Sequence, residues 1–289
     1  MISDPHRYDR RMHLPTIRPM TAADAGATAE GILRSGWGDR RVKMEWVVSH
    51  PQCRPVVADA AGSIVGTGVT TVNGPVAWIG TIWVDPAWRG RGIGKALTQA
   101  TIDAAEAAGC RALVLVATEA GRPLYEGFGF MVQTKYRILE APGLGSGATD
   151  PEIRSFRPSD RAAMVELDAA ATGEDRAHLL DAFAAPGTTR CLEHPDGTLG
   201  GFVIRAPWGG GATIAPDPDD ALAILEARRR ASSPDKRVRA GLLEDNHVGL
   251  ERLRAAGWTD VWGAPRMVRG DVPPWNPDAI WGQFDHAMG

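Results

Sequence analysis

The chain has 289 residues, of which 44% are hydrophobic and 23% charged, with 34 Gly, 21 Pro and 3 Cys. This composition excludes a disordered chain, collagen and a disulfide scaffold, and the length suggests about two domains that each bury a core. The formal net charge of −3 offers no basic face for a nucleic-acid backbone, so we expect no nucleic-acid partner.

The first half alternates strand and helix patterns. Residues 1–13 are polar, and we expect them to be disordered. Asn73-Gly74 marks a hairpin turn, and apolar residues recur at helical spacing between residues 93 and 108. The order predicts an α/β fold on a mixed sheet. The patterns predict strands at 14–20, 53–60, 63–72, 76–84, 111–117 and 130–138, and helices at 22–33, 40–50, 93–108 and 119–127.

The chain contains a diverged repeat. Ile17–Asp24 opens the first copy as a strand that leads into a helix, and Ile153–Asp160 opens the second copy in the same way. The hydroxyl residues Thr21 and Ser159 are the predicted helix caps. We therefore expect two domains of the same fold in tandem.

The boundary between the copies lies near residue 148. The segment 141–151 is rich in Gly and Pro and carries no aromatic residue, which is typical of a linker. This division gives one domain at 14–140 and a second at 152–289.

The loop after strand 76–84 carries the clearest chemical signal. Glycines in a turn that leads into a helix let several backbone N–H groups converge on one anion, and arginine or lysine adds charge. Such a loop is expected to bind a pyrophosphate. Its glycines and cations are Arg89, Gly90, Arg91, Gly92, Gly94 and Lys95.

Two nucleotide-loop families do not fit this loop. A Walker A loop, GxxxxGK(S/T), needs Gly where Arg89 stands and a hydroxyl where Ala96 stands. A Rossmann loop needs GxGxxG spacing, and the glycines here follow GxGxG.

A third pattern does fit. Arg89, Gly92 and Gly94 match Q/R-x-x-G-x-G/A, and residues 124–130 match LYExxGF. With these motifs the chain resembles the GNAT family of acetyl-CoA-dependent N-acetyltransferases. The resemblance implies a twisted mixed sheet in which the strand that ends at Val84 splays from the next strand to admit the pantetheine arm.

The resemblance also implies roles for individual residues. Tyr125 of the LYExxGF motif corresponds to the family's general acid. The chemistry supports this role, because a phenol of pKa about 10 suits proton transfer to a departing thiolate. Thr118 stands where the family often has an Asn that contacts the cofactor. The implied cofactor-binding set is Ile82, Trp83 and Val84 for the pantetheine, and Arg89, Gly90, Arg91, Gly92, Ile93, Gly94 and Lys95 for the pyrophosphate.

The general base and the acceptor site are less defined. Asp85, Glu45 and His50 are candidate bases, although Asp85 also suits a turn cap, and we favour proton transfer through ordered water. Trp37 and Trp46 lie where the family builds its acceptor pocket, so they form either an aromatic floor of that pocket or part of the core.

The second half has the same strand and helix patterns as the first half, but it lacks the glycine loop and the tyrosine of the predicted cofactor site. Its loop carries Asp217, Asp219 and Asp220 and no Gly, so it would repel phosphates, and Leu253 replaces the tyrosine. This half resembles the degenerate C-terminal domain of tandem GNAT proteins and is not expected to bind cofactor.

These observations predict transfer of an acetyl group from acetyl-CoA to a primary amine by direct attack in a ternary complex. The acceptor is a small molecule or a peptide, and no metal is expected. The alternative is an acyl-CoA-binding sensor or interaction protein without turnover. Cys53, Cys110 and Cys191 form no motif, and no apolar run is long enough to span a membrane, so we expect free thiols and a cytoplasmic protein without a membrane partner.

Overall fold

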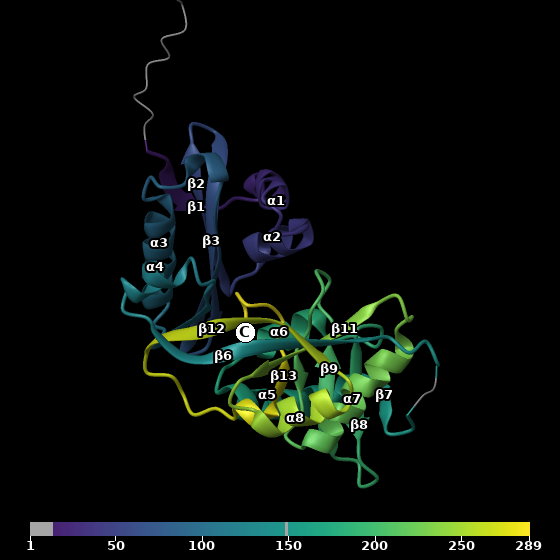
Figure 1. The fold of residues 1–289 in the computed structure, drawn as a ribbon. Helices are drawn as coiled ribbons and strands as arrows, with labels where there is room; N and C mark the ends of the chain where they lie inside the picture. The colour runs from purple at the N-terminus through teal and green to yellow at the C-terminus, as the bar shows by residue number, and fades with distance from the viewer. Residues whose placement is uncertain (1–13, 148–149) are drawn as a thin grey trace, which may run out of the picture.

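The computed structural model describes residues 14–147 and 150–289 (Figure 1). Residues 1–13, which were expected to be disordered, and residues 148–149 of the expected linker lie outside the described residues. The first half folds in the predicted order: β1 (Thr16–Pro19), α1 (Asp24–Arg34), α2 (Arg41–Ser49), β2 (Cys53–Ala60), β3 (Ser63–Asn73), β4 (Val76–Val84), η1 (Pro86–Trp88), α3 (Ile93–Ala107), β5 (Ala112–Val116), α4 (Arg122–Glu126) and β6 (Met131–Pro142).

The second half repeats this order of elements and adds a last strand. Two copies of one fold are therefore confirmed. Its elements are β7 (Ile153–Ser155), η2 (Pro158–Asp160), α5 (Arg161–Thr172), α6 (Ala177–Phe183), β8 (Thr189–Glu193), β9 (Leu199–Ile204), β10 (Thr213–Ile214), α7 (Pro218–Ala231), β11 (Arg237–Leu243), α8 (His247–Ala255), β12 (Thr259–Gly270), η3 (Pro277–Ala279) and β13 (Ile280–Gly282).

Each copy opens with the same arginine–aspartate pair. Arg18 Nη1 lies 2.7 Å from Asp24 Oδ2, and Arg154 Nη1 lies 2.7 Å from Asp160 Oδ2. The predicted hydroxyl caps are wrong, because no side chain caps α1 or α5. Instead Asp24 accepts hydrogen bonds from the N–H and the hydroxyl of Thr21, at 2.8 and 2.7 Å. The hydrogen bonds from Arg18 hold the pKa of Asp24 below its usual range, so the carboxylate stays charged for these contacts.

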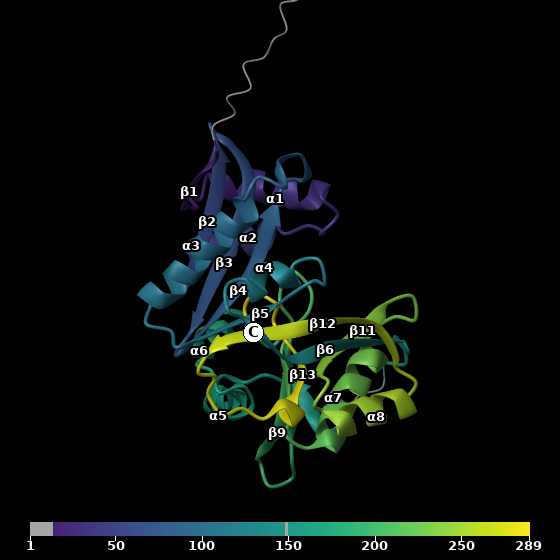
Figure 2. The ribbon, with the colours of Figure 1, turned by 60° about the vertical axis from the view of Figure 1, so that its left-hand side comes forward.

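The two halves exchange strands, as Figure 2 shows. The larger sheet has the order β1-β2-β3-β4-β5-β12-β6-β11, and the smaller has the order β13-β10-β9-β8-β7. β12 of the second half lies antiparallel between β5 and β6, and β6 lies antiparallel between β12 and β11. Because β6 has partners on both edges, it continues to Pro142, beyond the predicted end at residue 138.

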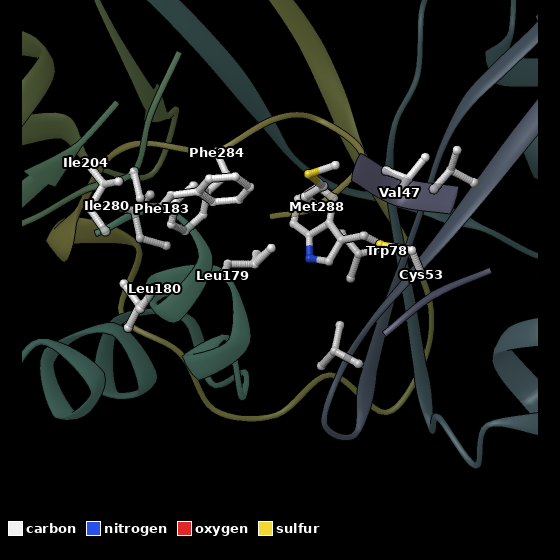
Figure 3. Close-up of a cluster of buried hydrophobic side chains, with 14 of the residues drawn as sticks. Val47, Cys53, Trp78, Leu179, Leu180, Phe183, Ile204, Ile280, Phe284 and Met288 are labelled. Atoms are coloured by element: carbon white, nitrogen blue, oxygen red, sulfur yellow. The ribbon is translucent and has the colours of Figure 1, made fainter. Parts of the chain in front are cut away.

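A buried hydrophobic cluster crosses the boundary between the halves (Figure 3). Trp78 of the first half is 1% exposed and belongs to the same cluster as Leu179 and Phe183 of the second half. Glu174 of the second half accepts a hydrogen bond from Trp78 Nε1 at 3.0 Å and one from Asn73 Nδ2 at 2.7 Å. Burial of each large apolar side chain contributes about 1.5–3 kcal/mol. Neither half alone would bury this surface.

Two smaller expectations can also be compared with the structure. Cys53, Cys110 and Cys191 are free and buried, which confirms ordinary unpaired thiols. Among the helices of residues 14–147 and 150–289, none is both long and apolar enough to cross a membrane.

Candidate active site

The site begins where β4 and β5 separate. The two strands pair in parallel only from Val76↔Ala112 to Trp78↔Val114. Beyond that point a cavity of ≈ 900 Å³ lies between them, which confirms the implied splay. Thr81 has a φ of +52° next to an irregularity in the pairing of β3 with β4. This left-handed backbone conformation is strained for a β-branched residue, and such strain gathers at ligand sites.

The glycine loop closes one end of the cavity. Asp85 accepts a hydrogen bond from the N–H of Ala87 at 2.9 Å and so caps η1, which is the turn role considered for it. Gly90 and Gly92 have φ of +76° and +79°, and a Cβ on either would meet open space. Glycine is therefore favoured here by backbone conformation and by room for a ligand. No side chain caps α3, so the N–H groups of its first turn are available to an anion.

Arginines hold the shape of this loop. Arg89 Nε donates to the carbonyl of Val84 at 3.1 Å. Arg91 donates to the carbonyl of Ala87 at 3.2 Å, and its guanidinium lies 5.0 Å from the Trp88 ring. The loop is thus ordered by its own side chains before any ligand arrives.

Tyr125 lies on α4 and lines the same cavity, half-buried. Burial raises its pKa to about 12, so the phenol stays protonated at neutral pH. Thr118 also lines the cavity, and its Oγ1 accepts a hydrogen bond from the N–H of Gly121 at 3.1 Å. Asn246 makes the corresponding contact with the N–H of Gly249 at 2.8 Å in the second half.

The structure brings most of the predicted site residues to one cavity and leaves four outside it. Trp83 is buried, and its Nε1 donates to Ser35 Oγ at 2.9 Å, so its side chain packs on α1. Arg91 and Lys95 do not line the cavity. The predicted residues that line it are Trp37, Ile82, Val84, Arg89, Gly90, Gly92, Ile93, Gly94, Thr118 and Tyr125.

The fourth residue, Trp46, belongs to an aromatic contact between the halves. Its ring stacks on His50 with centroids 4.3 Å apart, and lies 5.0 Å from Phe183 and 5.9 Å from Trp208. Trp46 therefore packs between the halves and does not line the cavity, which favours the core interpretation over the floor of an acceptor pocket. His50 is held in the same contact, and neither it nor Glu45 lines the cavity.

Comparison with known proteins decides the family. Residues 28–130 match the acetyltransferase (GNAT) family, and residues 164–282 match an acetyltransferase (GNAT) domain. The chain belongs to the GNAT acetyltransferase family. Since the two matches lie one after the other, it is a tandem GNAT protein, as the motifs implied.

Related proteins agree with this assignment. A putative acetyltransferase from Pyrococcus horikoshii has a similar fold, with a TM-score of 0.80 and 21% identity over 98% of this chain and 100% of that chain. A tandem GNAT protein from the clavulanic acid biosynthesis pathway has a TM-score of 0.61 and 16% identity. The similarity covers 91% of this chain and 100% of that chain. The uncharacterized N-acetyltransferase YitH of Bacillus subtilis is 28% identical over 175 residues, which cover 58% of this chain and 61% of that protein.

The motifs did not reveal an ion pair in the cavity wall that joins Lys43 of the first half to Asp285 of the second half. Lys43 of α2 lies inside the cavity wall, with Nζ 2.5 Å from Asp285 Oδ1 and 3.2 Å from Thr81 Oγ1. Burial alone would raise the pKa of Asp285, but the Lys43 ammonium keeps it below its ordinary value. No local motif signals this pair, because its members lie at opposite ends of the chain.

His286 follows Asp285 and also lines the cavity. Its ring stacks on Tyr136 and on Trp262, with centroids 5.4 and 5.2 Å away. Burial lowers the pKa of His286, so the imidazole is neutral at pH 7 and can accept a proton. Burial also lowers the pKa of the sequence candidate His50, but His50 does not line the cavity.

The second domain has no comparable loop of its own. Asp217 caps α7 by accepting from the N–H of Asp219 at 2.7 Å, and the helix begins directly at Pro218. Leu253 is fully buried. β13 lies beside β10, where the first domain has β5 beside β4. Among the described residues no group of His, Cys, Asp and Glu is placed to hold a metal ion.

Proposed function

We propose that this GNAT protein transfers an acetyl group from acetyl-CoA to a primary amine by direct attack in a ternary complex. The observation that carries the proposal is the single ≈ 900 Å³ cavity that joins the glycine loop, the splayed strands and the phenol of Tyr125. Loop and strands fit the co-substrate, because the first turn of α3 offers free N–H groups and Arg89 adds positive charge.

The proposed sites divide along the cavity. Residues 14–140 carry the acetyl-CoA site, and residues 152–289, after the linker at 141–151, bind no cofactor and complete the acceptor side. Trp37 is kept as an acceptor contact, since it lines the cavity and is 42% exposed. The proposed cofactor contacts are the backbone of Ile82, Trp83 and Val84, the side chain of Thr118, and the loop Arg89, Gly90, Arg91, Gly92, Ile93, Gly94 and Lys95.

Two residues move protons in the proposed reaction. Acetyl-CoA supplies the acyl group, which passes from sulfur to the amine nitrogen. Tyr125 donates its proton to the departing thiolate, which is chemically matched to a phenol. His286 accepts the proton that the attacking amine loses, and its lowered pKa keeps it in the accepting form. His286 replaces the ordered water that we favoured as the base from the sequence.

The proposed location is the cytoplasm. Three free and buried cysteines support it, because reducing compartments keep thiols unpaired. The acceptor is a small-molecule or peptide amine.

Thiol release from acetyl-CoA with a panel of amines tests the activity. Tyr125→Phe is expected to lower acceptor-stimulated release by about 10²- to 10⁴-fold, the range for a lost general acid. Unchanged turnover in that variant would remove the phenol from the reaction. The alternative function, an acyl-CoA sensor, predicts CoA binding without acceptor-stimulated thiol release by the wild-type protein.

A pair of glycine variants tests the loop. Gly92→Glu places a bulky anion in the loop and is expected to abolish CoA binding. Gly109→Glu is the matched control, because Gly109 has a φ of +80° against +79° for Gly92, and a Cβ at either position meets open space. Both variants carry the same backbone strain, so tight CoA binding by Gly92→Glu would refute the loop assignment.

A further inference from the structure

A second cavity of ≈ 810 Å³ adjoins the proposed acetyl-CoA cavity, and we call it the arginine cavity. The two cavities share Arg40, Trp262, Asp285 and His286 in their linings. The remaining walls come from β6, β11, β12, α7, the loop between β9 and β10, the end of β13 and the residues directly after it. His286, the proposed base, thus lies where the two cavities meet.

The charges around this cavity are strongly unbalanced. Its one lining carboxylate, Asp285, is already paired with Lys43. Two of the lining arginines share Glu140, with nitrogens 3.7 and 3.2 Å from its oxygens. The lining arginines are Arg40, Arg205, Arg228, Arg237 and Arg239.

Among the described residues, three of these arginines, Arg40, Arg205 and Arg228, have no carboxylate partner, whereas Arg237 and Arg239 share Glu140. In residues 14–147 and 150–289, no carboxylate oxygen lies within 4.0 Å of the guanidinium of Arg40, Arg205 or Arg228. Within the part of the chain that the structure describes, Arg228 donates to the backbone carbonyl of Arg239, at 3.1 Å. Burial, with the nearby charge of Arg205, lowers the pKa of Arg228 to about 10. Arginine stays protonated in proteins, so its half-buried charge remains unneutralised, and an anion would relieve that cost.

Another cavity of the second domain provides a contrast. It has a volume of ≈ 740 Å³ and is lined by Arg154 and Arg157. There Arg154 pairs with Asp160 at 2.7 Å, and Arg157 pairs with Glu193 at 3.4 Å. The charges of that cavity are matched internally, so arginine in a cavity wall does not by itself leave an unfilled anion site.

We propose that the arginine cavity binds a carboxylate or phosphate group of the acceptor and thereby presents the acceptor's amine to His286. This assignment rests on the proposed acetyl transfer and names the acceptor class: amines that carry an anionic group. Guanidinium groups suit both anions because their planar donors match two oxygens at once. Arg205 and Arg228 are the specificity residues of this site.

The anion site is tested by binding, which needs no turnover. Inorganic phosphate and citrate are titrated calorimetrically into protein saturated with CoA, so that the glycine loop is already occupied. Arg228→Gln is expected to weaken binding of the preferred anion at least tenfold, which corresponds to about 1.4 kcal/mol. Arg157→Gln is the control, since its arginine lines the matched cavity, and binding should stay within twofold of wild type. Absence of binding of both anions, or equal binding by the two variants, overturns the proposal.

Turnover then separates this proposal from the proposed function. Thiol release is compared for glucosamine 6-phosphate against glucosamine, and for 4-aminobutyrate against butylamine. Wild-type protein is expected to prefer the anionic member of one pair at least tenfold, and Arg228→Gln should lose that preference. If anions bind as expected and neither pair gives release above the uncatalysed rate, the acetyl transfer fails for these amines and the anion site stands. Release without preference for the anionic members refutes the acceptor class.

Discussion

Lys43→Met tests whether the ion pair with Asp285 holds the final segment of the chain, and with it His286, against the proposed acetyl-CoA cavity. The side chains of Lys43 and Asp285 are 3% and 17% exposed, and their charged atoms are 2.5 Å apart. Removal of one partner of a buried pair costs about 3–5 kcal/mol, because the other charge stays buried and unpaired. Asp285 also accepts from the N–H of Ala287 at 2.9 Å, which the variant retains, so we expect a loss of about 3 kcal/mol.

Urea unfolding at pH 7 measures this loss. Arg41→Met on the same helix is the control, because its pair with Glu30 is 3.2 Å long and its side chains are 48% and 58% exposed. An exposed pair contributes about 0–1 kcal/mol. The double variant Lys43→Met/Asp285→Asn should recover part of the stability, since no unpaired charge remains. Unfolding of Lys43→Met and Arg41→Met at the same urea concentration would refute the stabilising role of the Lys43–Asp285 pair.

The pH dependence of the same experiment has a definite sign. Lys43 holds the pKa of Asp285 below its ordinary value, so this pair stabilises the fold fully above the unfolded pKa of about 3.9. The stabilisation is lost as the pH falls through the lower, folded pKa. The difference between wild type and Lys43→Met should therefore be largest near neutral pH and should narrow in acid. A difference that widens in acid would contradict the assignment.

Three further substitutions probe the cleft, the contact between the halves and the arginine cavity. Gly80→Ala would place a Cβ 2.2 Å from Ala287 Cβ, so we expect about 1–3 kcal/mol lower stability in urea and slower acceptor turnover; wild-type values for both would contradict this. Trp46→Ala should cost about 3–5 kcal/mol and leave the Kd for CoA within twofold, because its ring packs between the halves; a large loss of CoA affinity would return Trp46 to the ligand site. Arg228→Met should raise the Tm measured without anions, because the substitution removes an unpaired charge from a partly buried position. A lower Tm would indicate that the arginine has a purely structural role.

The positive-φ glycines of the loop and the place of Tyr125 on a helix after β5 could be predicted because their signals are local. A turn that needs φ above zero selects glycine, and Gly90 and Gly92 adopt it. The strand and helix periods of the first half are equally local, so the element order was predictable. The helix caps were misjudged because Asp24, three residues after Thr21, is kept charged by Arg18 and binds the threonine hydroxyl. Thr21 therefore donates its hydroxyl to Asp24 and does not accept from an N–H of α1.

The rest of the site depends on contacts between residues far apart in the chain. Asp285 and His286 reach the cavity because the final segment of the chain packs against β3. Thr71 of β3 donates from Oγ1 to the carbonyl of Ala287 in that segment, at 3.0 Å. No periodicity encodes such a contact. For Trp46 the local signal pointed to two roles, because an aromatic side chain suits both a ligand pocket and a core. The packing of Phe183 against its ring, which the sequence does not show, favours the core.

The exchange of β6 and β12 gives a physical reason why the second domain persists without a nucleotide loop. β12 pairs with β5 from Arg266↔Val116 to Gly270↔Ala112, so the strand that borders the cleft takes its second edge partner from the other half. The chain that follows β12 supplies Asp285 and His286 to the cavity wall. Loss of the second half would leave β5 with a bare edge and remove the proposed base, whereas loss of its phosphate loop disturbs neither. The constraint on the second domain is therefore to complete the first sheet and the proposed acceptor side, and the carboxylates at the start of α7 are compatible with both roles.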